Sequence, residues 1–514
     1  MSIVRGLSIV VPFLALLAMG CVKRMERQVV EPAAYQTMNR KAPFLKAHMR
    51  DGRLYVLSDW SIDSVSHAVV GTGPVYDATR TITDRGAQRV DLDSVALFET
   101  NVARTSPSVA MLGLVTGLSA GVTVFCLTNT KACFGSCPTF YASDGWHDRL
   151  QAEGFSASVA PSLEARDVDA LYRARARDGT VTLRMVNEAY ETHVVRSANL
   201  LVVPREAGTR IVADEGQTLW SVDQPVPPLT CVGPEGDCLD RVASFDERER
   251  LSLADSTDLT TRETVELAWN APPGGKGQPA IMIASRQSLL QTYLLYQTFA
   301  YLGGSVGEWL AKFERGDPLA KRHAGSLVSL LGGIDVLVPD RAGRWRQVGR
   351  ILETGPLAAD VKIVRLPRGS DPTRVRLRMA RGAWRIDYVA LTTVTGAVEP
   401  QRLAPREVFH RGTLAVDARR RLLDPDETLV TFPGDEYTLV YRLPDASREY
   451  EFFLESQGYY LEWMREEWIA EENPVEAARL FLDPVGSLKR LAPQFKRVES
   501  DLENAFWRSK YAGL

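Results

Sequence analysis

The chain has 514 residues, of which 45% are hydrophobic and 24% are charged, as in ordinary globular proteins. Its formal net charge of −3 at pH 7 argues against nucleic-acid binding, and no stretch dense in lysine and arginine is interleaved with aromatic residues. The length is enough for three or four domains with sizeable hydrophobic cores.

The first twenty residues have the pattern of an export signal. Arg5 precedes an uncharged segment from Leu7 to Ala18, which has signal-peptide length and is too short to span a membrane. The segment ends in Leu17-Ala18-Met19-Gly20-Cys21, which resembles the lipobox of bacterial lipoproteins. We therefore predict cleavage before Cys21 and acylation of its thiol, where each buried methylene contributes roughly 0.8 kcal/mol to anchoring. The alternative is an ordinary secretory signal with an incidental cysteine.

The residue that follows the predicted anchor is Val22 rather than aspartate. By analogy with enteric bacteria, this favours the outer membrane over the inner membrane. We therefore expect a lipid-anchored protein of the cell envelope whose membrane contact is made through Cys21.

Besides Cys21 the chain has five cysteines, which an oxidising envelope compartment makes disulfide candidates. Cys231 and Cys238 bracket a turn that contains glycine and proline, so a local bridge is the simplest interpretation. The other candidates cannot all pair among themselves, so one is free, buried or intermolecular; they are Cys126, Cys133 and Cys137. Their spacing lacks a second ligand pair for zinc, and the six histidines are scattered. We expect no metal site and no cofactor.

Residues 21–43 are predicted to be a tether. A small β-domain, barrel or sandwich, is expected over residues 44–105, because short strand-like runs are separated by turn signals such as Asp51-Gly52.

An uncharged segment follows from Val109 to Leu127, in which Gly113, Gly117 and Gly121 recur at a four-residue spacing. On a helix these glycines share one face and allow another backbone to approach closely. The length makes the segment a transmembrane candidate. A span here, however, would separate the anchored N-terminal part from the rest of the chain. We favour a buried helix over residues 106–130, and the choice between spanning and buried stays open.

Residues 131–270 are predicted to form a second β-domain. Four features recur in it: Cys137-Pro138 before aromatic residues, the turn Asp144-Gly145, the step Glu153-Gly154, and a strand region with Asn187-Glu188 and Glu191-Thr192. In these features the chain resembles a family of uncharacterised bacterial envelope lipoproteins. The resemblance extends more thinly over most of the mature chain, and it implies an envelope location and a β-rich fold. It supplies no activity and no catalytic residues.

The pattern is helical over residues 284–316 and returns to strands over residues 330–456, where glycine and proline separate short runs as in a β-sandwich. One strand alternates Arg374, Arg376 and Arg378 with apolar residues, which indicates either a solvated face or a surface for anions. Residues 457–514 are predicted to be helical, with Pro474 and Pro484 at first turns. This helical region begins with an aromatic cluster in an acidic context, made of Tyr459, Tyr460, Trp463 and Trp468.

The conspicuous acidic pair is Asp144 with Glu153. Two carboxylates near a turn suit acid–base work on a glycosidic bond if they converge in a cleft. Asp-Gly is, however, first of all a hairpin signal, so we assign no catalytic residues. No Gly-x-Ser-x-Gly motif is present in the sequence.

The fold class predicted from these patterns is α+β and mostly β. The expected organisation in chain order is a signal peptide (1–20), a tether (21–43), a small β-domain (44–105), an apolar glycine-rich helix (106–130), a β-domain (131–270), a helical segment (284–316), a β-sandwich-like domain (330–456) and C-terminal helices (457–514).

We expect a structural or binding component of the envelope that recruits a protein or a glycan. Two other functions stay open: an envelope hydrolase that uses Asp144 and Glu153, and an assembly factor that oligomerises through the Gly113, Gly117 and Gly121 face.

Overall fold

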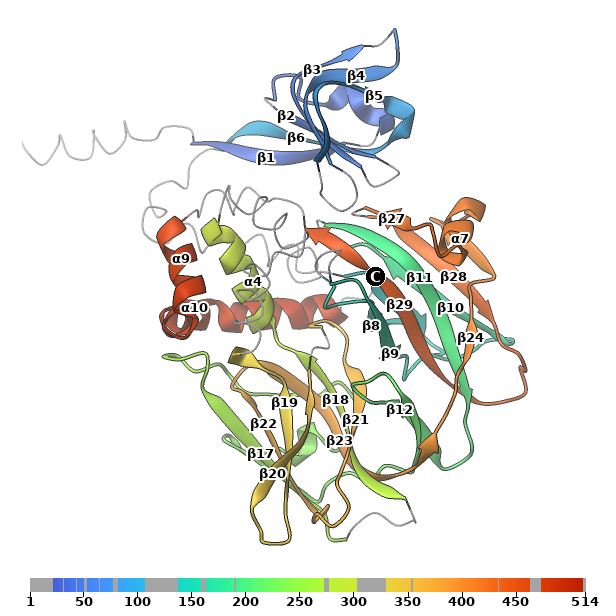
Figure 1. The fold of residues 1–514 in the computed structure, drawn as a ribbon, viewed down its shortest axis with the longest axis vertical. Coiled ribbons are helices and arrows are strands. Elements are labelled where there is room, and N and C mark those ends of the chain that lie inside the picture. Colours follow the sequence, from blue (N-terminus) through green and yellow to red (C-terminus); the bar gives the residue numbers. More distant parts are fainter. Residues whose placement is uncertain are drawn as a thin grey trace, which may run out of the picture. The chain divides into compact units, whose positions relative to one another are not determined.

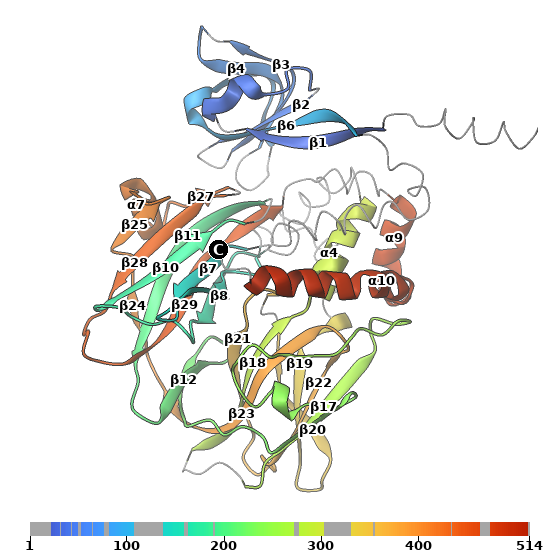
Figure 2. The same cartoon turned by 180° about the vertical axis from the view of Figure 1, so that it is seen from behind.

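The computed structural model describes residues 22–30, 32–42, 44–49, 53–63, 65–76, 82–106, 137–158, 163–188, 191–271, 277–302, 330–352, 355–432, 434–462 and 473–511. The expected fold class is confirmed: the chain is mostly β, with several sheets and C-terminal helices. It divides into two compact units, one formed mainly by residues 1–128 and the other, here called the main unit, formed mainly by residues 129–514. Figures 1 and 2 show the elements of each unit.

The N-terminal unit contains sheet A, in which six antiparallel strands have the order β1-β6-β2-β3-β4-β5. The strands are β1 (Val22–Val30), β2 (Phe44–Met49), β3 (Leu54–Asp63), β4 (Ala68–Tyr76), β5 (Ile82–Asp91) and β6 (Val95–Ser106), with the short 3-10 helices η1 (Pro32–Thr37) and η2 (Leu92–Ser94). Alternate residues Leu45, Ala47 and Met49 of β2 are buried, as expected for a strand with one face on the core. This core also contains Leu57, Val69 and Phe98.

The tether expected over residues 21–43 is wrong, because residues 22–30 form β1 and pair with β6 from Val22↔Ser106 to Val30↔Phe98. The segment is short and has no turn signal of its own. Its hydrogen-bond partner lies about seventy residues later, which a local pattern does not reveal. β6 likewise continues to Ser106, at the start of the range expected to be an apolar helix.

The described residues of the main unit form four sheets. Sheet B has the order β26 (Thr413–Leu414), β25 (Glu407–His410), β28 (Glu436–Arg442), β10 (Thr180–Val186), β7 (Thr139–Ser143), β8 (Asp148–Glu153). Sheet C has the order β24 (Gln401–Leu403), β11 (Glu191–Pro204), β29 (Tyr450–Glu462), β9 (Ala165–Ala170), and β27 (Leu429–Thr431) also pairs with β11.

Sheet D has the order β13 (Leu219–Asp223), β12 (Thr209–Ala213), β21 (Asp360–Arg365), β18 (Gln278–Gln287), β23 (Trp384–Ala397), β16 (Arg250–Leu251). Sheet E has the order β15 (Gly236–Asp237), β14 (Thr230–Gly233), β17 (Arg262–Ala268), β22 (Arg374–Ala380), β19 (Ile334–Pro339), β20 (Trp345–Ile351). The 3-10 helix η4 (Leu239–Arg241) lies between β15 and β16 in the chain.

These sheets do not follow the domain boundaries expected from the sequence. Residues 139–204 and 401–462 together build sheets B and C, whereas residues 209–397 build sheets D and E. The separate domains expected over residues 131–270 and 330–456 are therefore wrong. The long pair of β11 with β29, from Glu191↔Glu462 to Pro204↔Tyr450, joins strands from both ranges. Sheets D and E are thus formed by a segment inserted between the two halves of sheets B and C.

Among the described residues, two large apolar cores join sheets B, C and D of the main unit. The first lies between sheets B and C and includes Phe140, Leu183, Leu200 and Leu454, with Leu422 of α7 (Val416–Leu423) packed against it. The second lies between the other face of sheet C and sheet D, and includes Val168, Leu201, Phe453, Ile211, Met282 and Ile363. Sheet C is therefore covered on both faces, and its second face joins it to the inserted segment.

Three helices of the main unit pack together: α4 (Leu289–Leu302), α9 (Pro474–Leu482) and α10 (Pro484–Tyr511). The Tyr293 ring of α4 is 5.0 Å from the Phe495 ring of α10, and Pro474 occupies the first turn of α9 with Asn473 as its N-cap. Among the described residues, no helix is long and apolar enough to cross a bilayer.

The helical start expected at about residue 457 is wrong, because Tyr459 and Tyr460 belong to β29 and are buried. Tyrosine favours a strand, and β29 lies in the interior of sheet C between β11 and β9. Trp463 and Trp468 lie outside the described residues.

The structure has a disulfide between Cys231 and Cys238, at the turn where the sequence suggests a local bridge. The Cys137 thiol is buried and donates to Glu153 Oε1 at 3.3 Å. Several predicted features lie outside the described residues, namely the signal peptide, Cys21, Cys126, Cys133 and the helix that carries Gly113, Gly117 and Gly121.

Candidate functional site

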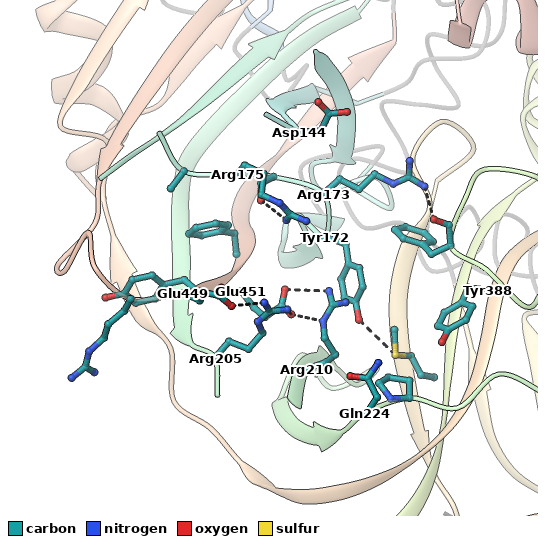
Figure 3. Close-up of a pocket in the computed structure, with 18 of the residues that line it drawn as sticks. Asp144, Tyr172, Arg173, Arg175, Arg205, Arg210, Gln224, Tyr388, Glu449 and Glu451 are labelled. Carbon is teal, nitrogen blue, oxygen red and sulfur yellow. Dashed lines mark hydrogen bonds and ion pairs between the residues drawn. The ribbon is translucent and has the colours of Figure 1, made fainter. Parts of the chain in front are cut away.

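A pocket of about 960 Å³ lies in the main unit where residues of sheet C meet residues of sheet D. Figure 3 shows most of the side chains that line it. One wall comes from the segment after β9, the loop before β29 and the start of β29, and the other comes from β12, β18, β23 and adjacent loops. Its volume is at the upper end of the range for ligand pockets, roughly 300–1,000 Å³.

The pocket has a buried floor and an exposed rim. Met282, Glu451 and Phe452 are buried at the floor, whereas Ala446 and Arg448 on the rim are exposed. A molecule that entered from solvent would therefore meet charged side chains first and aromatic or apolar surface further in.

Five arginines and three carboxylates line the pocket, and most of them are paired with one another or with neighbours outside it. They are Arg173, Arg175, Arg205, Arg210, Arg448, Asp144, Glu449 and Glu451. Guanidinium and carboxylate groups are planar and offer several hydrogen bonds in fixed directions. The polar groups of the lining are therefore held in fixed orientations.

Arg210 is held on two sides. Its Nε lies 2.5 Å from Glu451 Oε1, and its guanidinium carbon lies 3.7 Å from the centre of the Tyr172 ring, a cation–π arrangement. The Tyr172 hydroxyl donates to Met282 Sδ at 3.7 Å. Burial raises the pKa of Tyr172, so this hydroxyl stays protonated at neutral pH.

Arg205 connects the rim to the floor. Its Nη2 lies 2.5 Å from Glu449 Oε2 at the rim, and its Nη1 lies 3.7 Å from Glu451 Oε1. The hydrogen bond from Arg205 lowers the pKa of Glu449. The Nε atom of Arg205 is buried and has no hydrogen-bond partner within the part of the chain that the structure describes.

The charge of Arg173 is balanced by two carboxylates that do not line the pocket. Its Nη1 lies 2.9 Å from Glu247 Oε1, and its Nη2 lies 3.9 Å from Asp387 Oδ2. The guanidinium also stacks on Phe245 at 4.6 Å from the ring centre. Burial, reinforced by the charge of Glu249, raises the pKa of Asp387 to about 7.

A buried ion pair continues from this wall into sheet D. Arg286 and Glu249 are almost fully buried, and they form two hydrogen bonds at 2.7 and 2.6 Å. Arg286 Nη1 also donates to the Pro356 carbonyl at 2.5 Å, and Arg385 Nη1 lies 3.5 Å from Glu249 Oε2.

A second buried charge cluster joins sheet C directly to sheet D. Lys362 Nζ of β21 lies 2.7 Å from Asp360 Oδ2 and donates to the Val168 carbonyl of β9 at 3.1 Å. Asp360 Oδ1 accepts from the amide of Ala170 at 3.1 Å. Asp169 Oδ2 is buried and has no partner among the described residues.

The ionisation of this cluster is governed by burial and by like charges. Burial, together with the charges of Asp167 and Asp360, raises the pKa of Asp169 well above its usual value. Burial alone would lower the pKa of Lys362, but the neighbouring aspartates outweigh it, so this pKa is raised. Lys362 is therefore the cation that keeps these carboxylates together.

The structure does not bring Asp144 and Glu153 together. They lie at opposite ends of the β7–β8 hairpin, because Thr139 pairs with Glu153 and Ser143 pairs with Asp148. At about 3.3 Å per residue, the five-residue step from Thr139 to Asp144 places Asp144 about 16 Å from Glu153 along the strands. Asp144 caps the turn and pairs with Arg149 at 2.6 Å. Glu153 is buried and accepts from the amides of Leu357 and Ala358 at 2.6 and 2.9 Å.

The pKa of Asp144 is lowered to about 2, chiefly by the hydrogen bond from the backbone of His147. Asp144 is thus a turn residue that also lines the pocket, whereas Glu153 is a structural acceptor elsewhere.

Two of the three arginines singled out in the sequence are paired in sheet E, and Arg374 lies 5.5 Å from the centre of the Trp345 ring. Arg376 lies 2.5 Å from Glu266 of β17, and Arg378 lies 3.0 Å from Asp335 of β19. The pocket arginines come from separate segments of the chain, and the one visible pattern that includes any of them, the alternation of Arg173, Arg175 and Arg177, was not singled out in the sequence. Only the pairing of β11 with β29 brings Arg205 beside Glu449 and Glu451.

The described residues contain no group of three or more His, Cys, Asp or Glu side chains placed to hold a metal ion. Among the described side chains that line the pocket, no histidine or cysteine is present.

Comparison with known proteins adds no function. No protein-family model matches the sequence, and no curated protein is significantly similar to it. Among solved structures, the secreted serine protease VesC from Vibrio cholerae aligns over 71% of this chain and 76% of its own, with 8% identity and a TM-score of 0.14. A structure of infectious bursal disease virus, Gx strain, aligns over 96% and 92%, with 8% identity and a TM-score of 0.11. Both scores are too low to carry a statement about fold or activity.

Proposed function

We propose that this chain is a saccharide-binding component of the bacterial cell envelope, without catalytic activity of its own, and that the pocket between sheets C and D is its binding site. The observation that carries the proposal is the lining, where oriented guanidinium and carboxylate groups stand beside aromatic rings in one large cavity.

A saccharide suits this lining for two reasons. Its many hydroxyls are matched by planar side chains that donate or accept several hydrogen bonds each, and here these include Arg210, Glu451 and Gln224. The apolar faces of sugar rings pack against aromatic side chains, and here Tyr388 and Tyr450 line the cavity. The paired arrangement of the charges keeps these groups in place before a ligand arrives, which lowers the entropic cost of binding.

Glycoside hydrolysis receives no support from the acidic pair. The two carboxyl groups of such enzymes are roughly 5–10 Å apart across the bond that is cleaved. Asp144 and Glu153 are further apart, and Glu153 is occupied by two backbone amides. We therefore prefer binding to catalysis.

The location is proposed from the sequence alone. Acylation of Cys21 would anchor the protein, with the outer membrane favoured over the inner membrane. Cells that express the full chain should incorporate radiolabelled palmitate into it, and Cys21→Ser should abolish the label. Equal labelling of both forms would rule out this anchor.

A bulky side chain placed on the rim tests whether the pocket is the binding site. Ala446 lies exposed on the rim, so Ala446→Trp should block the cavity without disturbing either core. Ala342→Trp is a matched control, because Ala342 is an exposed turn residue between β19 and β20, outside the lining. Titration calorimetry with tetramers of N-acetylglucosamine and of galacturonic acid should show binding of at least one tetramer to the wild type and to the control. Ala446→Trp should bind about tenfold more weakly or worse, a loss of about 1.4 kcal/mol or more. Equal affinity in all three proteins, or no binding of either tetramer to the wild type, would contradict the proposal.

A further inference from the structure

We infer that the saccharide carries an acidic group, a carboxylate or a phosphate, and that Arg175 is the residue that binds it. The inference rests on the proposed function and adds the chemical class of the ligand.

The side chains that line the pocket carry more positive than negative charge. Two of the three lining carboxylates, Glu449 and Glu451, are each paired with an arginine of the same pocket. The third, Asp144, is paired with Arg149. Among the described residues, no lining carboxylate is therefore left to form an ion pair with a further cation.

Arg175 is that further cation. It is exposed at the pocket, and its Nη1 donates a hydrogen bond to the carbonyl of Ala174 at 3.1 Å. Figure 3 shows this bond ending on the backbone. Within the described part of the chain, no carboxylate lies within ion-pair distance of Arg175. Its positive charge nevertheless reaches the rim, where it adds to the effect of Arg205 in lowering the pKa of Glu449.

The other pocket arginines differ from Arg175 in this respect. Arg173 is paired with Glu247 behind the wall, and Arg448 lies 3.4 Å from Asp445. Arg205 has one unpaired hydrogen-bond donor, because its buried Nε has no partner among the described residues. An acidic group that reached Arg175 would thus find a guanidinium that has no carboxylate partner among the described residues and donates to one backbone carbonyl, in a lining that also contains the unpaired Nε of Arg205.

The guanidinium fork selects the kind of group. It binds carboxylate and phosphate through two parallel hydrogen bonds, which are shorter and about twice as strong as neutral ones. Because an exposed arginine is screened by salt, affinity for the acidic ligand should fall as ionic strength rises. A neutral saccharide should show little salt dependence.

The test uses the full chain and three probes. They are a disaccharide of galacturonic acid, glucose 6-phosphate, and a neutral disaccharide of N-acetylglucosamine. Titration calorimetry compares the wild type with Arg175→Gln, Arg175→Lys and Arg177→Gln. Arg177 is the matched control, since it lies two residues further along the same segment, has a 95% exposed side chain and does not line the pocket.

We expect at least one acidic probe to bind the wild type more tightly than the neutral disaccharide. Arg175→Gln should weaken that binding by about tenfold or more, as the loss of a charge-assisted pair predicts. Arg175→Lys should retain part of the affinity, and Arg177→Gln should bind like the wild type. Binding of the carboxylate alone, the phosphate alone or both would support the inference and identify the acidic group.

Two results would overturn it. Equal binding of neutral and acidic probes would remove the need for an acidic group while leaving the proposed saccharide site intact. An equal effect of Arg175→Gln and Arg177→Gln would show that Arg175 is not the contact. If no saccharide binds at all, including the tetramers used for Ala446→Trp, the proposed function itself fails.

Discussion

Replacement of Lys362 with methionine should destabilise the main unit by roughly 3–5 kcal/mol, the usual cost of removing one partner from a buried ion pair. Lys362 and Asp360 are both buried, and their charged atoms are 2.7 Å apart. Methionine keeps most of the side-chain length but leaves Asp360 and Asp169 without their shared cation. The measurement is urea-induced unfolding of the full chain, monitored on the transition of the main unit.

The same cluster predicts a pH dependence with a definite sign. Because the folded pKa of Asp169 is raised, its bound proton stabilises the fold below the unfolded pKa of about 3.9. That contribution is lost as pH rises through the folded pKa. Asp169→Asn removes this group, so the variant should gain stability relative to the wild type as pH rises. Lys362→Met should lose least stability at low pH, where the carboxylates are protonated.

One outcome would contradict the prediction for Lys362. Exposed ion pairs contribute less than about 1 kcal/mol to stability. If Lys362→Met changes the free energy of unfolding by no more than this, the Lys362 cluster does not stabilise the contact between sheets C and D as a buried ion pair. Asp169→Asn serves as the control, because it removes an ionisable carboxyl group from the same cluster without removing the cation Lys362.

Replacement of Arg286 with methionine should cost about 3 kcal/mol, near the low end for a broken buried pair. The loss leaves Glu249 buried without its two hydrogen bonds, but Arg385 remains 3.5 Å away and offsets part of the charge. The free carbonyl of Pro356 adds to the cost, because an unsatisfied buried acceptor is unfavourable.

A double variant separates charge from packing. Arg286→Met combined with Glu249→Gln removes both charges, and it should recover more than half of the stability lost in Arg286→Met alone. Urea unfolding of Arg286→Met, Glu249→Gln, the double variant and the wild type gives the comparison. If the double variant is as unstable as the sum of its single changes, the two residues do not act as a pair.

Both clusters bear on the pocket. The Lys362 cluster joins β9 to β21, and the residues that follow β9 form one wall of the cavity. Glu249 of the second cluster acts on Asp387, which in turn faces Arg173 of the pocket lining. The pocket walls are therefore held by charges that lie behind them, and mutations there should weaken ligand binding together with stability.

The class of the fold could be read from local patterns, because strand alternation and turn signals act over a few residues. The 45–57 region shows this: the apolar residues Leu45, Ala47 and Leu57 alternate as expected and are buried in the N-terminal core. Pro474 and Pro484 likewise begin α9 and α10 as predicted.

The arrangement of the sheets could not be read in this way. β1 pairs with β6, and β11 pairs with β29 across about 250 residues. Such pairings depend on tertiary contacts that a single local segment does not encode. Tyr459 and Tyr460 illustrate the difficulty, since neighbouring acidic residues suggested a helix while burial in sheet C made them strand residues.

The candidate site could not be predicted from local sequence patterns for the same reason. The alternating arginines of β22 give a visible pattern, yet two of them, Arg376 and Arg378, pair with acids on adjacent strands. The pocket arginines Arg175, Arg205 and Arg210 have no common motif, and they meet only because the inserted segment packs against sheet C. Asp144 was noticed as half of an acidic pair, whereas the structure makes it a turn residue beside the pocket.

Amide hydrogen exchange of the full chain, with and without the galacturonic acid tetramer, tests most directly whether the pocket is a saccharide site. Ligand should slow exchange in residues 171–176, 205–211 and 446–452, which contain lining residues of both walls, and leave the turn at residues 340–344 unchanged. Protection confined to other segments, or no protection at a saccharide concentration that saturates binding, would contradict the account.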